Sequence, residues 1–265
     1  MHNKNIKAQL ILENGEIFNG KAFGYLKESV GEVIFNTSST GYQEIFTDPT
    51  NIGKMIVMTS PLIGNYGINL EDMESDDVKI RGVIVREKCE IPNNWRNEMS
   101  LDGFLKNNKI IGIEGIDTRA LTKVIRENGS MKGIINIRVG QLSESQIKQK
   151  LDFFNKNNLI EEHMLKEKYV IENKGIDICV IDLGIKKSIL NTLSDKGYRI
   201  TVFPRDFDVN EIIQINPKGI FISNGPEYNV NSNELCEKVN FLSEKYPIVG
   251  IGVGHLIIGQ TFGGK

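Results

Sequence analysis

The sequence contains few cysteines, a single tryptophan and no long hydrophobic run. Its cysteines lie far apart along the 265 residues: Cys89, Cys179 and Cys236. That spacing argues against both a disulfide framework and a zinc knuckle. No apolar stretch approaches the ~18 residues of a membrane span, and no apolar core of a signal peptide follows Met1. These absences predict a soluble, cytoplasmic protein that does not engage a membrane.

An excess of charge of one sign is also missing. Lys and Arg number 32 and Asp and Glu number 34, which gives a formal net charge of −2. This balance argues against a protein that binds nucleic acid through the phosphate backbone. Trp95 is not part of an alternating series of aromatic and basic residues, so base stacking has no support either. The length fits two domains of ordinary size.

The first half of the chain is typical of strands joined by turns. Asn14-Gly15 is a strong tight-turn pair between two short apolar segments, which predicts a hairpin. Residues 37–49 are rich in turn-forming and hydroxyl residues. Strands are predicted at residues 9–13, 16–18, 31–36, 54–59 and 81–86.

Two helices and a charged segment follow. Asp117 is expected to cap a helix over residues 117–128, which Gly129 ends. Ser143 and Gln146 have the spacing of a capping box and begin a second helix that runs to about residue 158. Residues 157–175 are interpreted as a linker. The predicted division is a first domain of residues 1–142, a helix and linker of residues 143–174, and a second domain of residues 175–265.

Strands and helices alternate in the second half, which predicts a parallel, doubly wound sheet. Ligands of such sheets bind beyond the carboxyl ends of the strands, so three loops become the candidate site: residues 182–186, 223–228 and 250–255. The expected strands are residues 176–182, 198–203, 219–223 and 247–251, and the expected helices are residues 186–196, 209–215 and 233–245.

The glycine-dense segment of residues 247–255 (PIVGIGVGH) runs from a buried strand into a new helix. A dinucleotide fingerprint fails because Ile257 occupies the position of the third glycine. A nucleophile elbow fits better, since it needs small neighbours such as Gly250 and Gly254 around a central residue. That central residue is Gly252, so the sequence predicts the architecture of an elbow without a nucleophile.

Seven segments in order resemble the small subunit of glutamine-hydrolysing carbamoyl-phosphate synthase, over essentially the whole chain. The resemblance implies an α/β protein with a β-rich N-terminal small-subunit domain, followed by an incomplete doubly wound domain like that of class I amidotransferases. The segments are residues 12–15 (LENG), 31–49 (GEVIFNTSSTGYQEIFTDP), 61–69 (PLIGNYGIN), 115–123 (GIDTRALTK), 182–186 (DLGIK), 219–226 (GIFISNGP) and 247–255.

The resemblance also implies a role. In the family, an elbow cysteine, a histidine and a glutamate release ammonia from glutamine. A large subunit uses that ammonia to make carbamoyl phosphate for pyrimidine and arginine biosynthesis. ATP and metal would belong to the large subunit, so no cofactor is expected in this chain. The expected partners are the large subunit and, as the family's substrate, glutamine, with neither nucleic acid nor membrane.

Carried over residue by residue, the family's cysteine falls on Gly252, so no catalytic residue is expected here. The family's glutamine-contacting Gln falls on Leu256, and Glu227 takes the place of a glycine. Val253 keeps the backbone N–H that serves the oxyanion. His255 matches a family histidine that is not the catalytic one. The implied vestigial glutamine pocket consists of Thr50, Gly225, Glu227, Val253 and Leu256.

The catalytic histidine and glutamate of the family would follow Lys265, so the resemblance implies a truncated pseudoenzyme in which binding of glutamine is doubtful. Two alternatives stay open. The chain could be a non-catalytic partner that stabilises or regulates an ammonia-using large subunit. It could also be a decayed gene fragment, in which case the nucleotide sequence downstream would still encode the missing residues out of frame.

Overall fold

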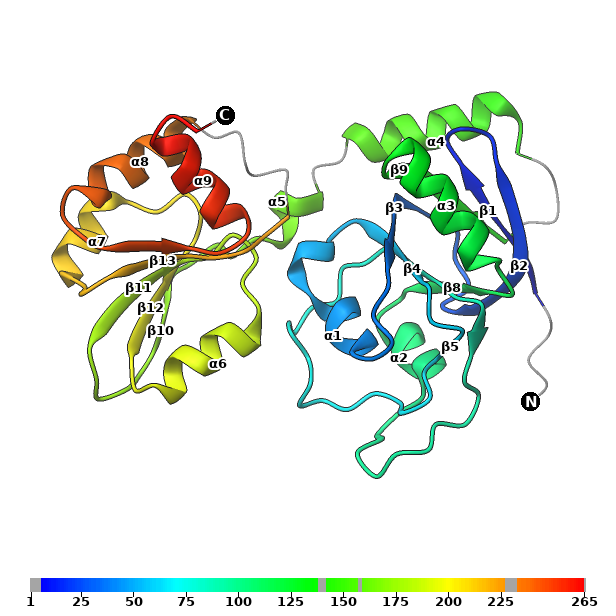
Figure 1. Cartoon of the computed structure of the whole chain (residues 1–265), viewed down its shortest axis with the longest axis horizontal. Helices are drawn as coiled ribbons and strands as arrows, with labels where there is room; N and C mark the ends of the chain where they lie inside the picture. Colours follow the sequence, from blue (N-terminus) through cyan, green and yellow to red (C-terminus); the bar gives the residue numbers. More distant parts are fainter. Residues whose placement is uncertain (1–5, 138–141, 157–158, 227–232, 265) are drawn as a thin grey trace. The chain divides into compact units, whose positions relative to one another are not determined.

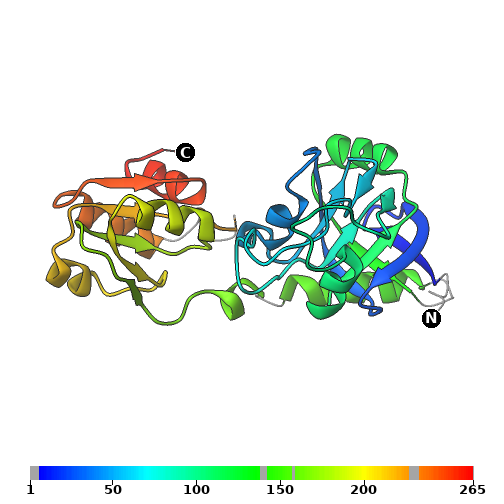
Figure 2. The same cartoon turned by 90° about the horizontal axis from the view of Figure 1, so that it is seen from below.

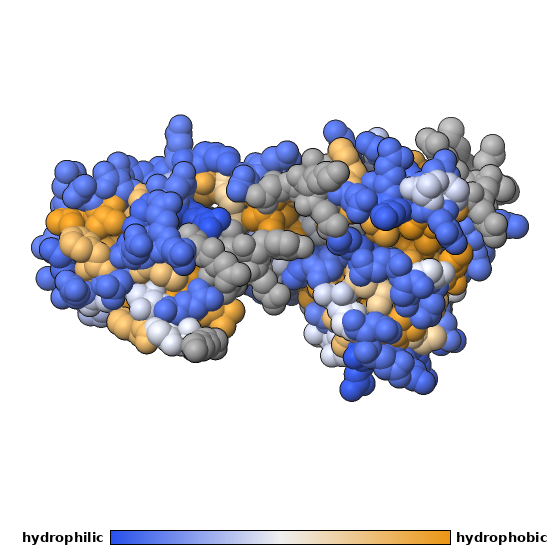
Figure 3. Space-filling model, turned by 90° about the horizontal axis from the view of Figure 1, so that it is seen from above, coloured by the Kyte–Doolittle hydropathy of each residue, from blue (hydrophilic) through white to orange (hydrophobic). Residues whose placement is uncertain are grey.

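The computed structural model describes residues 6–137, 142–156, 159–226 and 233–264 (Figure 1). The chain divides into two compact units, residues 1–159 and residues 160–265, each of which is described by itself. In the part of the chain so described, no helix is long and apolar enough to cross a membrane. Figure 3 shows a largely hydrophilic surface with smaller apolar patches on both units.

Unit 1 is built on a closed barrel with the strand order β1-β2-β8-β6-β4-β3-β9. The barrel closes because β9 pairs with β1 in antiparallel register, while β3, β4, β6 and β8 run parallel to one another. A separate short pair joins β5 (Leu62–Ile63) to β7 (Glu87–Lys88). The barrel strands are β1 (Lys7–Leu12), β2 (Ile17–Gly24), β3 (Ser29–Asn36), β4 (Lys54–Met58), β6 (Gly82–Ile84), β8 (Ile111–Glu114) and β9 (Met131–Asn136).

The predicted hairpin is confirmed as β1 and β2, drawn in dark blue at one side of unit 1 in Figures 1 and 2. Gly15 adopts a φ of 90°, which its missing Cβ permits, and its N–H donates to the Leu12 carbonyl at 2.9 Å. β2 continues beyond the predicted segment because its later residues pair with β8.

The helices of unit 1 are α1 (Tyr42–Thr47), the short 3-10 helix η1 (Pro49–Asn51), α2 (Leu101–Asn107), α3 (Thr118–Asn128) and α4 (Glu144–Lys156). α1 lies inside the turn-rich segment, where Tyr42 stacks on Tyr66 at 4.2 Å and donates to the Gly67 carbonyl at 2.6 Å. The predicted capping box of α4 is confirmed, because Ser143 and Gln146 exchange backbone-to-side-chain hydrogen bonds of 3.0 and 3.3 Å.

α3 seals one end of the barrel. Leu121 and Ile125 are buried in a cluster to which every strand of the barrel contributes, so that cluster fills the inside. The alternate residues of β4 and β6, such as Ile56 and Val83, face outward into a second cluster that α1 and α2 cover.

Unit 2 contains a sheet in the order β10-β12-β11-β13-β14, parallel except for the antiparallel edge strand β10. Helix α6 covers one face, and α7, α8 and α9 cover the other (Figure 1). The mixed α/β fold class is confirmed. The strands are β10 (Tyr169–Ile171), β11 (Asp177–Ile181), β12 (Arg199–Phe203), β13 (Ile220–Ile222) and β14 (Ile248–Gly250); the helices are α5 (Leu159–His163), α6 (Lys187–Asp195), α7 (Val209–Ile215), α8 (Asn233–Ser243) and α9 (Val253–Thr261).

The segment interpreted from the sequence as a linker contains α5 and β10. β10 pairs with β12 over three residues, of which Tyr169 faces Val202. The sequence interpretation therefore missed one strand of the sheet.

We predict that Asp117→Ala destabilises unit 1 by about 0.5–2 kcal/mol, because the Asp117 carboxylate accepts hydrogen bonds from the N–H groups of Arg119 and Ala120 at the start of α3. Urea unfolding followed by circular dichroism measures the loss. Asp117→Asn is the matched control, since asparagine caps helices as well as aspartate does; an equal loss in both variants would contradict the capping role.

Candidate functional site

The candidate site lies at the topological switch point of the unit 2 sheet. From β11 the chain moves to β12 on one side and then returns to β13 on the other. The loops that leave β11 and β13 therefore separate and open a crevice beyond their carboxyl ends. Residues 182–186 and 223–226 form these loops, as the alternating sequence pattern predicts.

Ser223 fastens the two loops together. Its hydroxyl accepts the N–H of Leu183 at 2.9 Å and donates to the Asn224 carbonyl at 2.7 Å, and its side chain is fully buried. On the β11 side, the Asp182 carboxylate accepts the N–H groups of Gly184 and Ile185 at 2.7 and 2.8 Å. Burial nevertheless raises the pKa of Asp182, because the carboxylate has little contact with water.

The predicted elbow is present as a sharp turn between β14 and α9. Gly252 stands at its apex with φ 57° and ψ −118°, a conformation that side chains rarely adopt. The glycines on either side are sterically required: a Cβ at Gly250 would stand 2.6 Å from backbone atoms of Gly254, and one at Gly254 would stand 2.3 Å from the Ile222 carbonyl oxygen. The elbow is therefore a close contact of backbone with backbone.

The apex itself has room for a side chain. A Cβ at Gly252 would meet only Asn224, with its Cβ at 3.5 Å, which is an ordinary van der Waals contact. A side chain there would be strained by the positive φ and not by crowding. The open direction at Gly252 is the one in which a nucleophile elbow presents its central residue.

Hydrogen-bonding groups remain unused around this turn. The N–H groups of Val253 and His255, in the first turn of α9, donate to no acceptor within the described parts of the chain. The side-chain amide of Asn224, 7% exposed, likewise has no partner among the described residues. Asn224 lies within residues 219–226, but the sequence analysis predicted no function for its side chain. Its position after a predicted buried strand, at the switch point of the sheet, could have indicated one.

The residues of the implied glutamine pocket come from both units. Gly225 and Val253 are buried beside the crevice, and a Cβ at Gly225 would stand 1.9 Å from the Leu183 carbonyl oxygen. Leu256 follows on α9 and is 46% exposed. Thr50 lies in η1 of the other unit, where its hydroxyl donates to Asp48 at 2.8 Å. Glu227 lies outside the described residues.

The other titratable residues singled out by the sequence do not form a reactive group. Cys179 is fully buried in the sheet, and burial raises the pKa of its thiol to about 12, which keeps it protonated and unreactive. His255 is exposed on α9. Within the described ranges no group of three or more His, Cys, Asp or Glu residues is placed to hold a metal ion.

Comparison with known proteins identifies both units. The family model "Carbamoyl-phosphate synthase small chain, CPSase domain" matches residues 10–135, and "Glutamine amidotransferase class-I" matches residues 179–265. The sheet, the switch-point crevice and the elbow thus define a glutamine amidotransferase-like domain that follows a small-chain barrel domain.

Relatives match along nearly the whole chain. It is 50% identical to the carbamoyl phosphate synthase small chain of Clostridium perfringens, over 98% of this chain and 74% of that protein. It is 42% identical to the small chain of Archaeoglobus fulgidus, over 98% and 73%, and 39% identical to the pyrimidine-specific small chain of Bacillus subtilis, over 97% and 71%. The chain belongs to the carbamoyl-phosphate synthase small-chain family.

Replacing three glycines of unit 2 by alanine should change its folding stability by different amounts. Gly252→Ala should cost about 1–3 kcal/mol through backbone strain alone. Gly225→Ala should cost more, because its Cβ would overlap the Leu183 carbonyl. Gly259→Ala, in the middle of α9 with open space around its Cβ, is the control and should stabilise unit 2 by about 0.5–1 kcal/mol. Thermal unfolding of the three variants tests the order; a Gly252 variant as stable as the Gly259 variant would contradict the strain at the elbow.

Proposed function

We propose that this chain acts as a carbamoyl-phosphate synthase small subunit that binds its large subunit but does not itself hydrolyse glutamine. The observation that carries the proposal is Gly252 at the apex of the elbow. The family role is the release of ammonia for carbamoyl phosphate synthesis. The name of the Bacillus subtilis relative supports a place in pyrimidine biosynthesis. Arginine biosynthesis is the other pathway in which the family's carbamoyl phosphate is used.

The missing step is covalent attack. Hydrolysis of the glutamine amide in this class needs a thiolate that adds to the amide carbon, displaces ammonia and leaves an acyl-enzyme for water to cleave. Glycine supplies no group that could form that bond. The unused N–H groups of Val253 and His255 could stabilise an oxyanion, but without a nucleophile no tetrahedral intermediate forms next to them.

Besides Gly252, a second position, Leu256, is expected to weaken the binding of glutamine. Leu256 stands where the resemblance places a glutamine side chain that holds the substrate, and leucine has neither a donor nor an acceptor. Glu227, at the position of a family glycine, would add a negative charge to the same pocket. These replacements support a pocket that has lost its affinity for glutamine.

We expect no release of glutamate above background when the full chain is incubated with glutamine and a carbamoyl-phosphate synthase large subunit. Gly252→Cys alone should also fail, because Leu256 still leaves the substrate without its contact. The measurement is glutamate formed per minute, with the Clostridium perfringens small chain as the active control. Turnover by this chain that alkylation of cysteine abolishes would overturn the proposal, and appreciable turnover by the Gly252→Cys variant would overturn the account of the pocket.

The alternative function is that of a purely structural or regulatory partner. The intact barrel of unit 1, matched by the small-chain model over residues 10–135, supports it. A large subunit would then use free ammonia, and this chain would stabilise it or change its activity. A decayed gene product remains the third possibility, although a closed barrel and a well-packed sheet do not favour it.

The partner role predicts that the chain co-purifies with a tagged large subunit and changes the rate of its ammonia-dependent carbamoyl phosphate synthesis. Gel filtration and a coupled assay with ammonium chloride measure the two effects. Gly252→Ala is the matched control, because a change at the elbow should leave both effects intact. Absence of a complex at micromolar concentration would remove the partner role.

A further inference from the structure

A second pocket, in unit 1 and independent of the elbow, lies along α3 at the end of the barrel that this helix seals. It has a volume of about 550 Å³. Thr37 and Thr59 enter it from the ends of β3 and β4, and α3 supplies the remaining wall. The lining residues are Thr37, Thr59, Arg119, Thr122, Lys123, Arg126 and Glu127.

The wall from α3 is strongly basic. Arg119, Lys123 and Arg126 follow one another at spacings of four and three residues, which places them on one face of the helix. Glu127 is the acidic residue among those that line the pocket. The excess of positive charge is local, because the whole chain has a formal net charge of −2.

Both guanidinium groups are available. The guanidinium groups of Arg119 and Arg126 form no hydrogen bond or ion pair within the described part of the chain, and the bond of Arg119 to Asp117 uses its backbone N–H. Arg96, by contrast, is bound by Glu71 and Asp72 at 3.0 and 2.8 Å. An unpaired guanidinium keeps its planar set of donors, which matches the oxygens of a phosphate or carboxylate.

The stability of α3 does not explain Arg119, although Arg126 lies in the last turn, where a cation stabilises the helix dipole. Arg119 lies in the first turn, where a cation opposes the helix dipole, and acidic residues are absent from that turn. Lys123 forms only a loose pair with Glu127, at 3.9 Å between two largely exposed side chains. The Asp117 carboxylate already caps this end of α3, and Arg119 adds beside it a positive charge that the stability of the helix does not require.

Hydroxyl groups complete the pocket opposite the helix. Thr37 and Thr59 directly follow β3 and β4, and the Thr59 N–H donates to the Asn36 carbonyl at 3.1 Å, which holds the two strand ends together. Neither threonine hydroxyl has a partner within the described ranges. Both can therefore donate to an oxygen of a ligand held by the arginines.

We propose that this pocket binds the phosphate or diphosphate group of a small molecule. Two guanidinium groups, an ammonium group and two free hydroxyl groups around about 550 Å³ suit a compact, highly charged anion. No aromatic side chain lines the described pocket, so it has no surface on which a nucleobase would stack. The charged group is therefore what is recognised.

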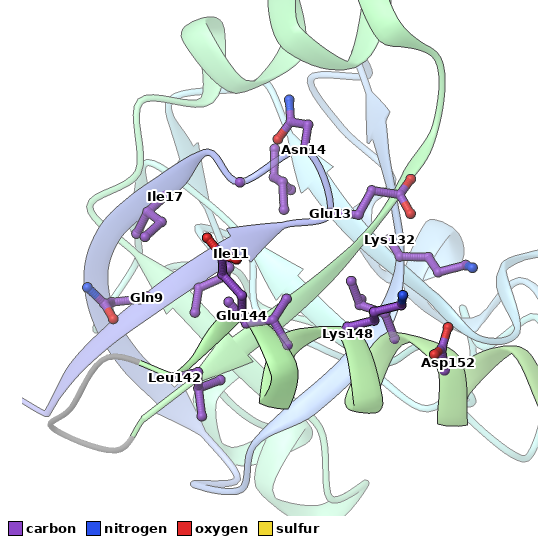
Figure 4. A pocket seen from close by; sticks show the side chains of 14 residues that line it. Gln9, Ile11, Glu13, Asn14, Ile17, Lys132, Leu142, Glu144, Lys148 and Asp152 are labelled. Carbon is purple, nitrogen blue, oxygen red and sulfur yellow. The ribbon is translucent and has the colours of Figure 1, made fainter.

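A larger pocket of unit 1 differs from this one in the signs of the charges that line it. It has a volume of about 660 Å³ and lies between the β1–β2 hairpin and α4 (Figure 4). Figure 4 shows acidic and basic side chains together around it: Glu13, Lys132, Glu144, Lys148 and Asp152. The charges around this pocket are of both signs, whereas the pocket along α3 presents mainly positive charge.

Isothermal titration calorimetry of the full chain with inorganic pyrophosphate tests the proposal. We expect saturable binding at one site that weakens as salt is raised. Arg119→Gln combined with Arg126→Gln should weaken it by at least about tenfold, while the corresponding double replacement by lysine should give an intermediate affinity, because charge remains and the planar donors are lost. Glutamine keeps a good helix propensity, so thermal unfolding should show α3 undisturbed.

The matched control is Lys21→Gln combined with Lys27→Gln, which removes two exposed cations of unit 1 outside the pocket and should change the affinity by less than about twofold. Inorganic phosphate distinguishes a single phosphate site, which would bind both ions alike, from a diphosphate site. The proposal is overturned if pyrophosphate shows no saturable binding, or if the control variant loses as much affinity as the arginine variant. It is also overturned if a hexaglutamate peptide binds more tightly than pyrophosphate, because that result would indicate a docking surface for an acidic protein segment.

Discussion

Direct contact between backbone and backbone is the constraint on which unit 2 depends. At the switch point, Gly254 lies against the Ile222 carbonyl and its N–H donates to the Ser223 carbonyl at 3.1 Å. Gly225 likewise leaves no room for a side chain, because a Cβ there would stand 1.9 Å from the Leu183 carbonyl oxygen. Because no side chain fits between these segments, α9 begins directly above the end of β13. The crevice, the free N–H groups and the position of Gly252 all follow from this contact.

Much of the fold could be predicted because its signals are local. The Asn14-Gly15 hairpin, the Asp117 cap and the alternation of strands with helices each depend on neighbouring residues. α1 was not predicted, since its six residues are fixed by Tyr66 and by Asn69, whose backbone bonds with the buried Gln43 side chain. β10 was missed for a similar reason: three residues in a charged segment become a strand only by pairing with β12.

The candidate site was predictable in place but not in detail. The sequence indicated the loops after β11, β13 and β14 and the empty centre of the elbow. It could not indicate that the Asn224 amide is buried without a partner, or that Arg119 and Arg126 stay unpaired, since pairing is decided by residues distant in the sequence. The role of Thr50 stays a prediction.

The geometry of Gly252 also has an evolutionary consequence. At φ 57° and ψ −118°, glycine is the residue that the turn holds with the least strain, so a family member that exchanges its central residue for glycine gains folding stability. If the proposed loss of the nucleophile is right, a later change of Gly252 to cysteine would lower the stability of unit 2, and Leu256 would still have to change before glutamine could be held. The backbone strain at this turn would therefore favour the change to glycine and oppose its reversal.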